Sequence, residues 1–192
     1  SDVSAVSQEI RLTSTTESNF NWILGASIAK DSAEENPHRI GYLDDLGVRF
    51  GLTYKQERLN AAVFGQGIWE LSDKLRLEVG GRFLYDDVDF YARTYIDVGG
   101  GGVNDEVVEF VVAGCPDPAG VIPLDCALDD TAFTGKIGLD YSVDDDTMIY
   151  GSIATGYKPG GFNGGLNTNS ELYTPYQEET VTALELGIKT DL

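Results

Sequence analysis

Two cysteines are the residues of this 192-residue chain whose type and spacing point most directly to chemistry. Cys115 and Cys126 lie in a polar, proline-containing segment, and two nearby cysteines in an exposed loop of an exported protein are typically joined as one disulfide. A metal site is the alternative, but it would need further ligands, and the only histidine, His38, is far away in the sequence. The spacing therefore predicts a disulfide and an oxidising compartment.

The other polar residues do not indicate a catalytic constellation. With one histidine, a triad or a zinc cluster would have to be built on His38 itself. A hydrolase of peptides or lipids could combine His38 with a loop carboxylate, but no motif marks such a pair. We therefore expect no enzymatic activity, no cofactor and no resident metal.

Two segments have the composition of ion- or phosphate-binding loops without their full pattern. The run Asp144-Asp145-Asp146-Thr147 lacks the glycine and the distal glutamate of an EF-hand loop, so a hairpin turn is predicted. The glycine-rich segment 156–163 (GYKPGGFN) has no GK[ST] ending and no helix after it, which excludes a phosphate loop. We interpret it as a transition from strand to loop, with the lip of a ligand entrance as the alternative.

The stretch that must position these loops is residues 57–86, ERLNAAVFGQGIWELSDKLRLEVGGRFLYD. Its odd-numbered positions are uncharged from Leu59 to Leu71 and again from Leu75 to Tyr85, a period of two that predicts two long strands. A short turn is predicted at Ser72-Asp73. The even-numbered positions form a more polar face that includes Lys74, Arg76, Glu78 and Arg82.

Two environments could receive the apolar face of this hairpin. A soluble sandwich packs it on a second sheet and uses strands of about 5–6 residues. An outer-membrane barrel presents it to lipid and needs strands of roughly 9–11 residues. The long alternation favours the barrel, as does the placement of Trp69 beside the turn and of Phe83 and Tyr85 at the far end, which suits two aromatic girdles.

Further strands are predicted on both sides of the hairpin. In the strand after the acidic turn the alternation is ambiguous, because Met148 and Tyr150 alternate against Ile149 and Ile153, and we assign Tyr150 to the lipid-facing side. A small strand is also expected at Glu106–Ala113. The predicted long strands outside the hairpin are Ala5–Ser14, Phe20–Lys30, Ala132–Val143, Thr147–Tyr157 and Glu179–Lys189. The hairpin itself is expected to begin with extended structure from Val48 and to continue through Val88, Phe90 and Ala92 to near Thr94.

Short and long connections alternate along the chain, so all the short ones would lie at one end of an antiparallel sheet and all the long ones at the other. Outer-membrane barrels have short periplasmic turns and long extracellular loops, whereas a soluble sandwich has no reason for such sorting. The sequence therefore predicts an all-β fold, an antiparallel transmembrane β-barrel segment of about seven meander strands, with an amphipathic soluble β-protein as the alternative. The short connections Thr15–Asn19, Ser72-Asp73 and Asp144–Asp146 alternate with the long ones Asp31–Gly47, Thr94–Asp130 and Lys158–Glu178.

The charge and hydropathy of the chain exclude some classes of binding partner. The formal charge of −19 disfavours binding to nucleic acid, and no apolar run approaches the roughly 20 residues of a membrane helix. The N-terminal SDVSAVSQ is not a signal peptide, so we expect the chain to begin after one or within a longer protein. The paired acids are interpreted as solvated loops, with local cation binding as the alternative, at Asp44-Asp45, Asp86-Asp87, Asp129-Asp130 and Asp144–Asp146.

Four stretches together resemble the barrel region of TonB-dependent receptors, the ligand-gated importers of the Gram-negative outer membrane. They are SQEIRLTS (7–14), AVFGQGIWELSDKLRLEVGGRFLYDD (62–87), YGSIATGYKPGGFNGG (150–165) and PYQEETVTALELGIKTDL (175–192). The resemblance implies a 22-stranded barrel in outer-membrane lipid, closed by an N-terminal plug through which TonB acts, and import of a ferric siderophore, cobalamin or an oligosaccharide. The chain shows neither plug nor closing strand, so we expect a segment of such a receptor; a passive porin-like barrel and a soluble secreted β-rich binding module are the alternatives.

Under this resemblance, ligand contacts are expected in the outer loops and the upper lumen. Exposed aromatic side chains there can stack on sugars or on apolar chelators. The candidates, chosen by location, are Tyr91, Arg93, Tyr95, Tyr157, Lys158, Phe162, Asn163, Tyr173 and Tyr176.

Overall fold

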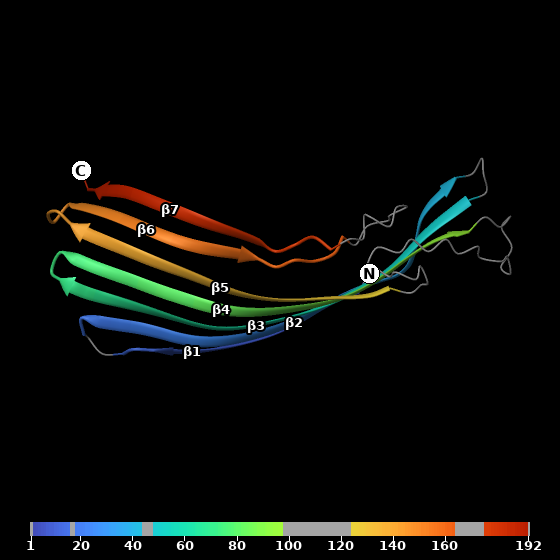
Figure 1. Cartoon of the computed structure of the whole chain (residues 1–192), viewed down its shortest axis with the longest axis horizontal. Helices are drawn as coiled ribbons and strands as arrows, with labels where there is room; N and C mark the ends of the chain where they lie inside the picture. Colours follow the sequence, from blue (N-terminus) through green and yellow to red (C-terminus); the bar gives the residue numbers. More distant parts are fainter. Residues whose placement is uncertain (1, 16–17, 44–47, 98–123, 164–174, 192) are drawn as a thin grey trace.

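The computed structural model describes residues 2–15, 18–43, 48–97, 124–163 and 175–191. Neighbouring strands pair antiparallel in chain order and form one seven-stranded sheet, so the predicted all-β meander is confirmed. Figure 1 shows them side by side in a curved sheet with the hairpin turns at its left end. The strands are β1 (Asp2–Thr13), β2 (Phe20–Leu43), β3 (Val48–Ser72), β4 (Leu75–Asp97), β5 (Leu124–Ser142), β6 (Thr147–Lys158) and β7 (Glu179–Thr190).

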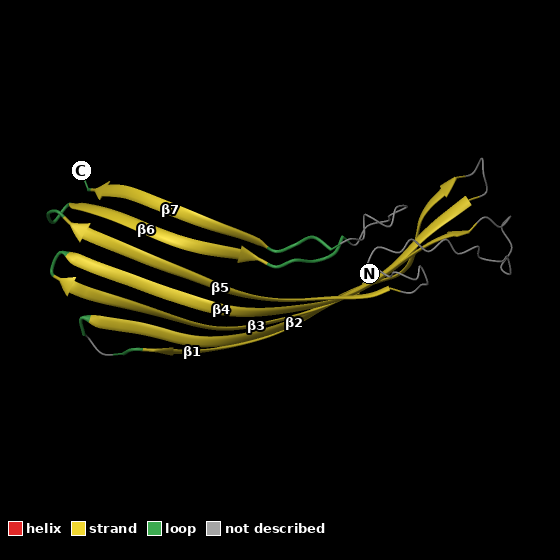
Figure 2. Ribbon diagram, in the orientation of Figure 1, coloured by secondary structure: helices red, strands yellow, loops and turns green. Residues whose placement is uncertain are grey.

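Figure 2 shows only strands and loops among the described residues. In that part of the chain, no helix is long and apolar enough to cross a membrane.

The strand registers place the apolar positions of all seven strands on one side of the sheet. Val79 of β4 pairs with Ile137 of β5, which pairs with Ile153 of β6. Because side chains alternate between faces, the residues in register share a face. We call this side the apolar face, and it includes Leu12, Leu24, Val63, Trp69, Val79, Phe83, Phe133, Ile137, Ile153 and Leu184.

The opposite side, which we call the polar face, carries Arg76, Glu78 and Arg82 as predicted. It also carries Tyr150, which pairs with Asp140 of β5, so its assignment to the lipid-facing side was wrong. The phenol hydroxyl donates a hydrogen bond to Glu185 Oε1 of the neighbouring strand β7 at 3.1 Å. Tyr150 therefore behaves as a polar-face residue despite its size.

Strand β3 has the predicted extent and β4 ends only a few residues later than expected, whereas β2 and β5 extend well beyond the predicted boundaries. Parts of the predicted loops Asp31–Gly47 and Thr94–Asp130 are strand, and the predicted turn at Ser72-Asp73 lies one residue later, at Asp73-Lys74. The acid pairs assigned to loops face each other inside the sheet, with Asp86 opposite Asp130 and Asp87 opposite Asp129. The strand expected at Glu106–Ala113 lies outside the described residues.

The early start of β5 was missed because the polarity of the sheet reverses at the level of Tyr85 in β4. Up to Tyr85 the odd positions of β4 are apolar and the even ones polar, whereas beyond it Asp87 and Asp89 continue the outer side while Val88 and Phe90 are buried on the other. The register of β4 with β3 shows no shift there, so the reversal lies in the sequence itself. Above this level, the outer face of the strand is polar and its inner face is apolar. The apolar-out, polar-in alternation typical of a membrane strand therefore no longer applies there.

The apolar face has the height of a membrane band. Between Leu75 and Tyr85 an antiparallel strand rises about 34 Å, at ~3.4 Å per residue. A tilt of about 40–45° reduces this to about 25 Å, which is the apolar height of outer-membrane barrels. The reversal of polarity at Tyr85 thus coincides with the edge of a band of that height.

Candidate ligand site on the polar face

A small apolar cluster lies on the polar face, above the level of Tyr85. Val88 and Phe90 come from β4, Cys126 comes from β5, and Phe162 comes from the connection between β6 and β7. Each of these four side chains is at most 6% exposed, and Tyr54 of β3 and Leu128 of β5 pack against them. Residues from three strands and one loop therefore form a local apolar core. On the opposite side of the sheet, β4 carries charged residues at the same level.

Residues 160–162 are anchored over this cluster by three kinds of contact. The rings of Phe162 and Phe90 are stacked, with centroids 4.9 Å apart and planes 5° from parallel. The Gly160 amide donates to Asp130 Oδ2 at 3.3 Å. The amides of Gly161 and Tyr176 donate to each other's carbonyl oxygens at 3.1 and 2.9 Å. The loop backbone is therefore hydrogen-bonded without being part of a strand.

The row of residues below the cluster is polar and largely enclosed. Asp86 is 3% exposed and accepts a hydrogen bond from Asn60 Nδ2 at 2.8 Å. The Tyr157 hydroxyl and Arg58 Nε are also buried without a hydrogen-bond partner among the described residues, and Arg58 lies level with Val88 of the cluster. Unsatisfied buried donors are uncommon in folded proteins, so these two atoms mark a part of the polar face with unused hydrogen-bonding capacity.

The structure separates the predicted ligand residues into groups. Phe162 belongs to the cluster just described. Tyr157 lies near the charged groups of Asp130, Asp86 and Arg58. Lys158 and Tyr176 meet at its side, with Lys158 Nζ 5.6 Å from the Tyr176 ring centroid, and Lys158 also pairs with Glu179 at 3.4 Å. Asn163 is exposed at the end of the described loop.

Tyr91 is not part of the cluster. It follows Phe90 in β4 and lines a hollow with Lys55, Glu57 and Asp89, which the cluster residues Phe90 and Cys126 also line. The side chains of Arg93 and Tyr95, and Tyr173 altogether, lie outside the described residues.

Sequence reasoning missed Phe90, Val88, Asp86, Asn60 and Arg58. The signal that could have found them is the reversed alternation after Tyr85, where apolar residues move to even positions. Cys126, also in the cluster, is disulfide-bonded. Cys115 lies outside the described residues, so the pairing of these two cysteines stays a prediction.

Nearer the hairpin turns, the polar face carries ion pairs between β4 and β5. Arg76 Nη2 lies 2.6 Å from Asp140 Oδ2, and Lys136 Nζ lies 3.1 Å from Glu78 Oε2. Gln66 of β3 also donates to Glu78 Oε1 at 3.1 Å. The face is thus a wall of paired charges that remain partly accessible to water.

A model of a protein family described as "TonB dependent receptor-like, beta-barrel" matches residues 6–192. The chain belongs to the TonB-dependent receptor family. The described strands are therefore a segment of a TonB-dependent receptor barrel, with an unclosed sheet.

A solved structure shows the same fold. The crystal structure of the ferric yersiniabactin uptake receptor FyuA from Yersinia pestis is similar to this chain, with a TM-score of 0.70 and 18% sequence identity. The match covers 99% of this chain and 26% of that receptor, so the chain spans about a quarter of the length of the similar receptor.

The exposure of the apolar face argues against the soluble alternative. Val63, Phe133 and Leu184 are 57%, 71% and 75% exposed. Among the described residues, no second sheet covers them, because all seven strands belong to one sheet. A soluble sandwich would bury these side chains, whereas a TonB-dependent receptor barrel exposes them to lipid.

Proposed function

We propose that this chain is part of an outer-membrane active transporter that binds a scarce solute and imports it with energy coupled through TonB. In this role the apolar face contacts outer-membrane lipid and the polar face lines the lumen. The solute is a ferric siderophore, cobalamin or an oligosaccharide. The uptake of ferric yersiniabactin by the structurally similar FyuA makes ferric siderophores the first class to test.

The main support for this proposal is the position of residues 160–162, which pack on the polar face above the level of the apolar band. Phe162 stacks on Phe90 at the level where the outer side of β4 becomes charged. A barrel with this arrangement places aromatic rings, the Tyr157 hydroxyl and Arg58 at the outer mouth of its lumen. Aromatic rings suit apolar chelators and sugars, and the two buried donors suit their oxygen atoms.

The lower polar face supports a role for a plug. The Arg76–Asp140 and Lys136–Glu78 pairs remain partly accessible, so they can exchange partners with another polar surface. A plug domain in the lumen would meet these charges, and TonB would act through that plug. A passive porin would instead leave the wall facing a water channel.

Uptake by the intact receptor under iron limitation tests the proposal. Cells that express the receptor are supplied with ⁵⁵Fe-loaded siderophores of different classes, in matched strains with and without TonB. We expect accumulation of one class, saturable and dependent on TonB. Uptake that continues without TonB indicates a passive pore and contradicts the proposal. If no siderophore is taken up, the same assay with labelled cobalamin and oligosaccharides decides between the remaining solutes and no transport.

A further inference from the structure

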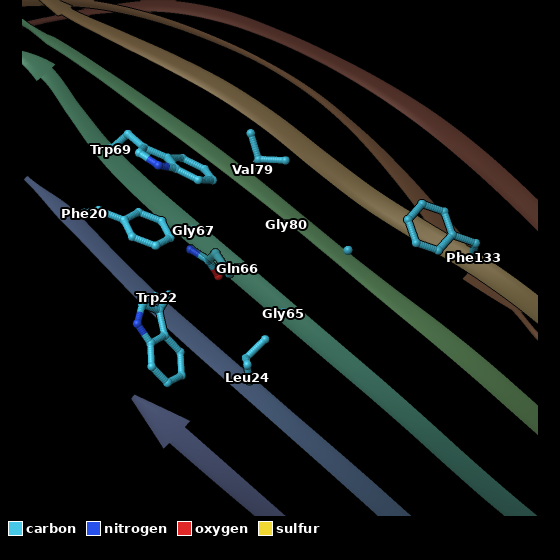
Figure 3. A pocket seen from close by; sticks show the side chains of 11 residues that line it. Phe20, Trp22, Leu24, Gly65, Gln66, Gly67, Trp69, Val79, Gly80 and Phe133 are labelled. Carbon is cyan, nitrogen blue, oxygen red and sulfur yellow. The ribbon is translucent and has the colours of Figure 1, made fainter. Parts of the chain in front are cut away.

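We propose that the apolar face carries a groove that holds one acyl chain of an outer-membrane lipid. The inference rests on the proposed function, because it needs this face to lie in the bilayer. The groove has a volume of about 570 Å³ and opens on the apolar face between β2 and β5. Figure 3 shows Phe20, Trp22 and Leu24 along β2 on one side, and Val79 and Phe133 on the other.

The groove exists because its floor is built from glycines. Gly65 of β3 pairs with Gly81 of β4, which pairs with Gly135 of β5, so three neighbouring strands lack side chains in one row. Gly67 extends this floor along β3. Neighbouring side chains lean over this row, since an added Cβ would meet Leu24 at Gly65, Trp69 at Gly67 and Phe133 at Gly81, and the space left between these side chains is a shallow groove.

Aromatic rings close the end of the trough that lies nearer the turn. Phe20 and Trp69 are stacked, with ring centroids 4.6 Å apart. A Cβ atom added at Gly67 would come within 2.6 Å of the Trp69 ring, so this ring lies directly over the glycine. Trp69 can lie flat over the sheet because Gly67 has no side chain, and its stacking on Phe20 fixes its position. The wall of the groove is therefore formed before any lipid binds.

The chemistry and the depth of the groove select an acyl chain. None of the lining residues is charged. Gly65 lies near the middle of the apolar band, where hydrocarbon is the surrounding solvent. A chain seated in a concave, rigid trough contacts more protein atoms than one that crosses a flat strand surface, because dispersion contacts add up over each methylene group. We therefore expect this chain to stay longer than the other lipids around the barrel.

The chain contains its own control for filling the groove. A Cβ atom at Gly65 would lie 2.8 Å from Cδ2 of Leu24 and 3.6 Å from a backbone oxygen. At Gly151, on the same face but outside the groove, it would lie 2.8 Å from Cδ2 of Leu186 and 3.7 Å from a backbone oxygen. The substitutions Gly65→Leu and Gly151→Leu thus place the same group in nearly the same local surroundings, and only the first fills the trough.

The test uses the intact receptor in proteoliposomes that contain a phosphatidylethanolamine with a diazirine at the middle of one acyl chain. After photolysis, the labelled peptides are identified by mass spectrometry. In the wild-type protein we expect labelling concentrated on peptides that contain Gly65, Trp69 and Phe133. Gly65→Leu should reduce this labelling about tenfold, the factor that corresponds to about two lost methylene contacts. Gly151→Leu should leave it unchanged.

The outcomes separate this inference from the proposed function. Labelling spread evenly over the apolar face, or unaffected by Gly65→Leu, shows ordinary surrounding lipid and overturns the groove. Little label on the Gly65 peptide, while the rest of the apolar face is labelled, shows that something other than an acyl chain, such as a second barrel, covers the groove and also overturns it. A wild-type receptor that does not insert, and so takes no label at all, contradicts the membrane role itself. If Gly65→Leu does not assemble, Phe133→Ala, which removes a wall of the groove, must lower the labelling instead.

Discussion

Phe162, in the connection between β6 and β7, lies flat against Phe90 of β4, with ring planes 5° from parallel. The two residues are far apart in the sequence, and β5 lies between β4 and β6 in the sheet. The contact therefore spans a strand, and it fixes a loop above the polar face before any ligand arrives. A site preformed in this way loses less conformational entropy on binding.

Replacement of Phe162 by alanine should release this loop. Truncating a buried phenylalanine costs about 3–5 kcal/mol, so the anchored state loses most of its advantage. We expect faster hydrogen exchange at the amides of Gly161 and Tyr176, which now donate to each other's carbonyls. Solute affinity should fall, while assembly of the barrel stays normal. Phe133→Ala, on the opposite face, is the control, and unchanged exchange in Phe162→Ala would contradict the anchoring role.

Lysine on the apolar face should destabilise the receptor according to depth. At the bilayer midplane a lysine costs about 2–4 kcal/mol, and near the interface about 0–1 kcal/mol. Ile137→Lys lies within the band, whereas Thr131→Lys pairs with Tyr85 at its edge. Folding into lipid vesicles, followed by urea titration, should show the larger loss for Ile137→Lys. Equal losses at both positions would be inconsistent with a lipid-facing band.

Removal of one charge from the outer acid pair should stabilise the sheet. Asp87 and Asp129 are directly opposite, and like charges at such positions repel by roughly 0.2–1 kcal/mol. Asp87→Asn should raise the free energy of unfolding by about that amount at low salt, and the gain should shrink at high salt because of screening. The Tyr85 hydroxyl, which donates to Asp87 Oδ2 at 3.0 Å, keeps an acceptor in the amide oxygen. Asp145→Asn, in the exposed turn, serves as the control; an equal gain there would point to net charge alone.

The predicted disulfide between Cys115 and Cys126 should protect both thiols from alkylation. Cys126 is only 6% exposed, so reduction should need unfolding or prolonged treatment. Mass spectrometry of iodoacetamide-treated protein should find no adduct before reduction and two after reduction in denaturant. The double variant with serine at both positions should lose about 3 kcal/mol, the stabilisation expected for the short loop closed between residues 115 and 126. An adduct on the unreduced native protein would contradict the pairing.

The strand pattern of the membrane band could be predicted from the sequence because one physical rule governs it. Between Leu59 and Leu71 every odd residue meets the same apolar solvent, so the alternation alone indicates the fold and the faces. In β6 the rule is ambiguous, since Ile149 and Tyr150 are both apolar enough to face lipid. Only the pairing of Tyr150 with Asp140 resolves it.

The candidate site was predicted less completely, because its contacts join distant segments. Phe162 was identified by its loop position, but its partner Phe90 was not. Asp86 and Asp130 were assigned to loops because paired acids are usually solvated. They lie in strands because Asn60 and the Gly160 amide supply their hydrogen bonds from elsewhere in the chain.

Beyond Tyr85, the alternation of β4 gives a single strand two separate surfaces. Asp87 and Asp89 lie on the outer side of the sheet, while Val88 and Phe90 build the apolar cluster on the polar face. A substitution at an outer position therefore changes the outer surface without touching the cluster. The two surfaces of this segment can change independently of each other.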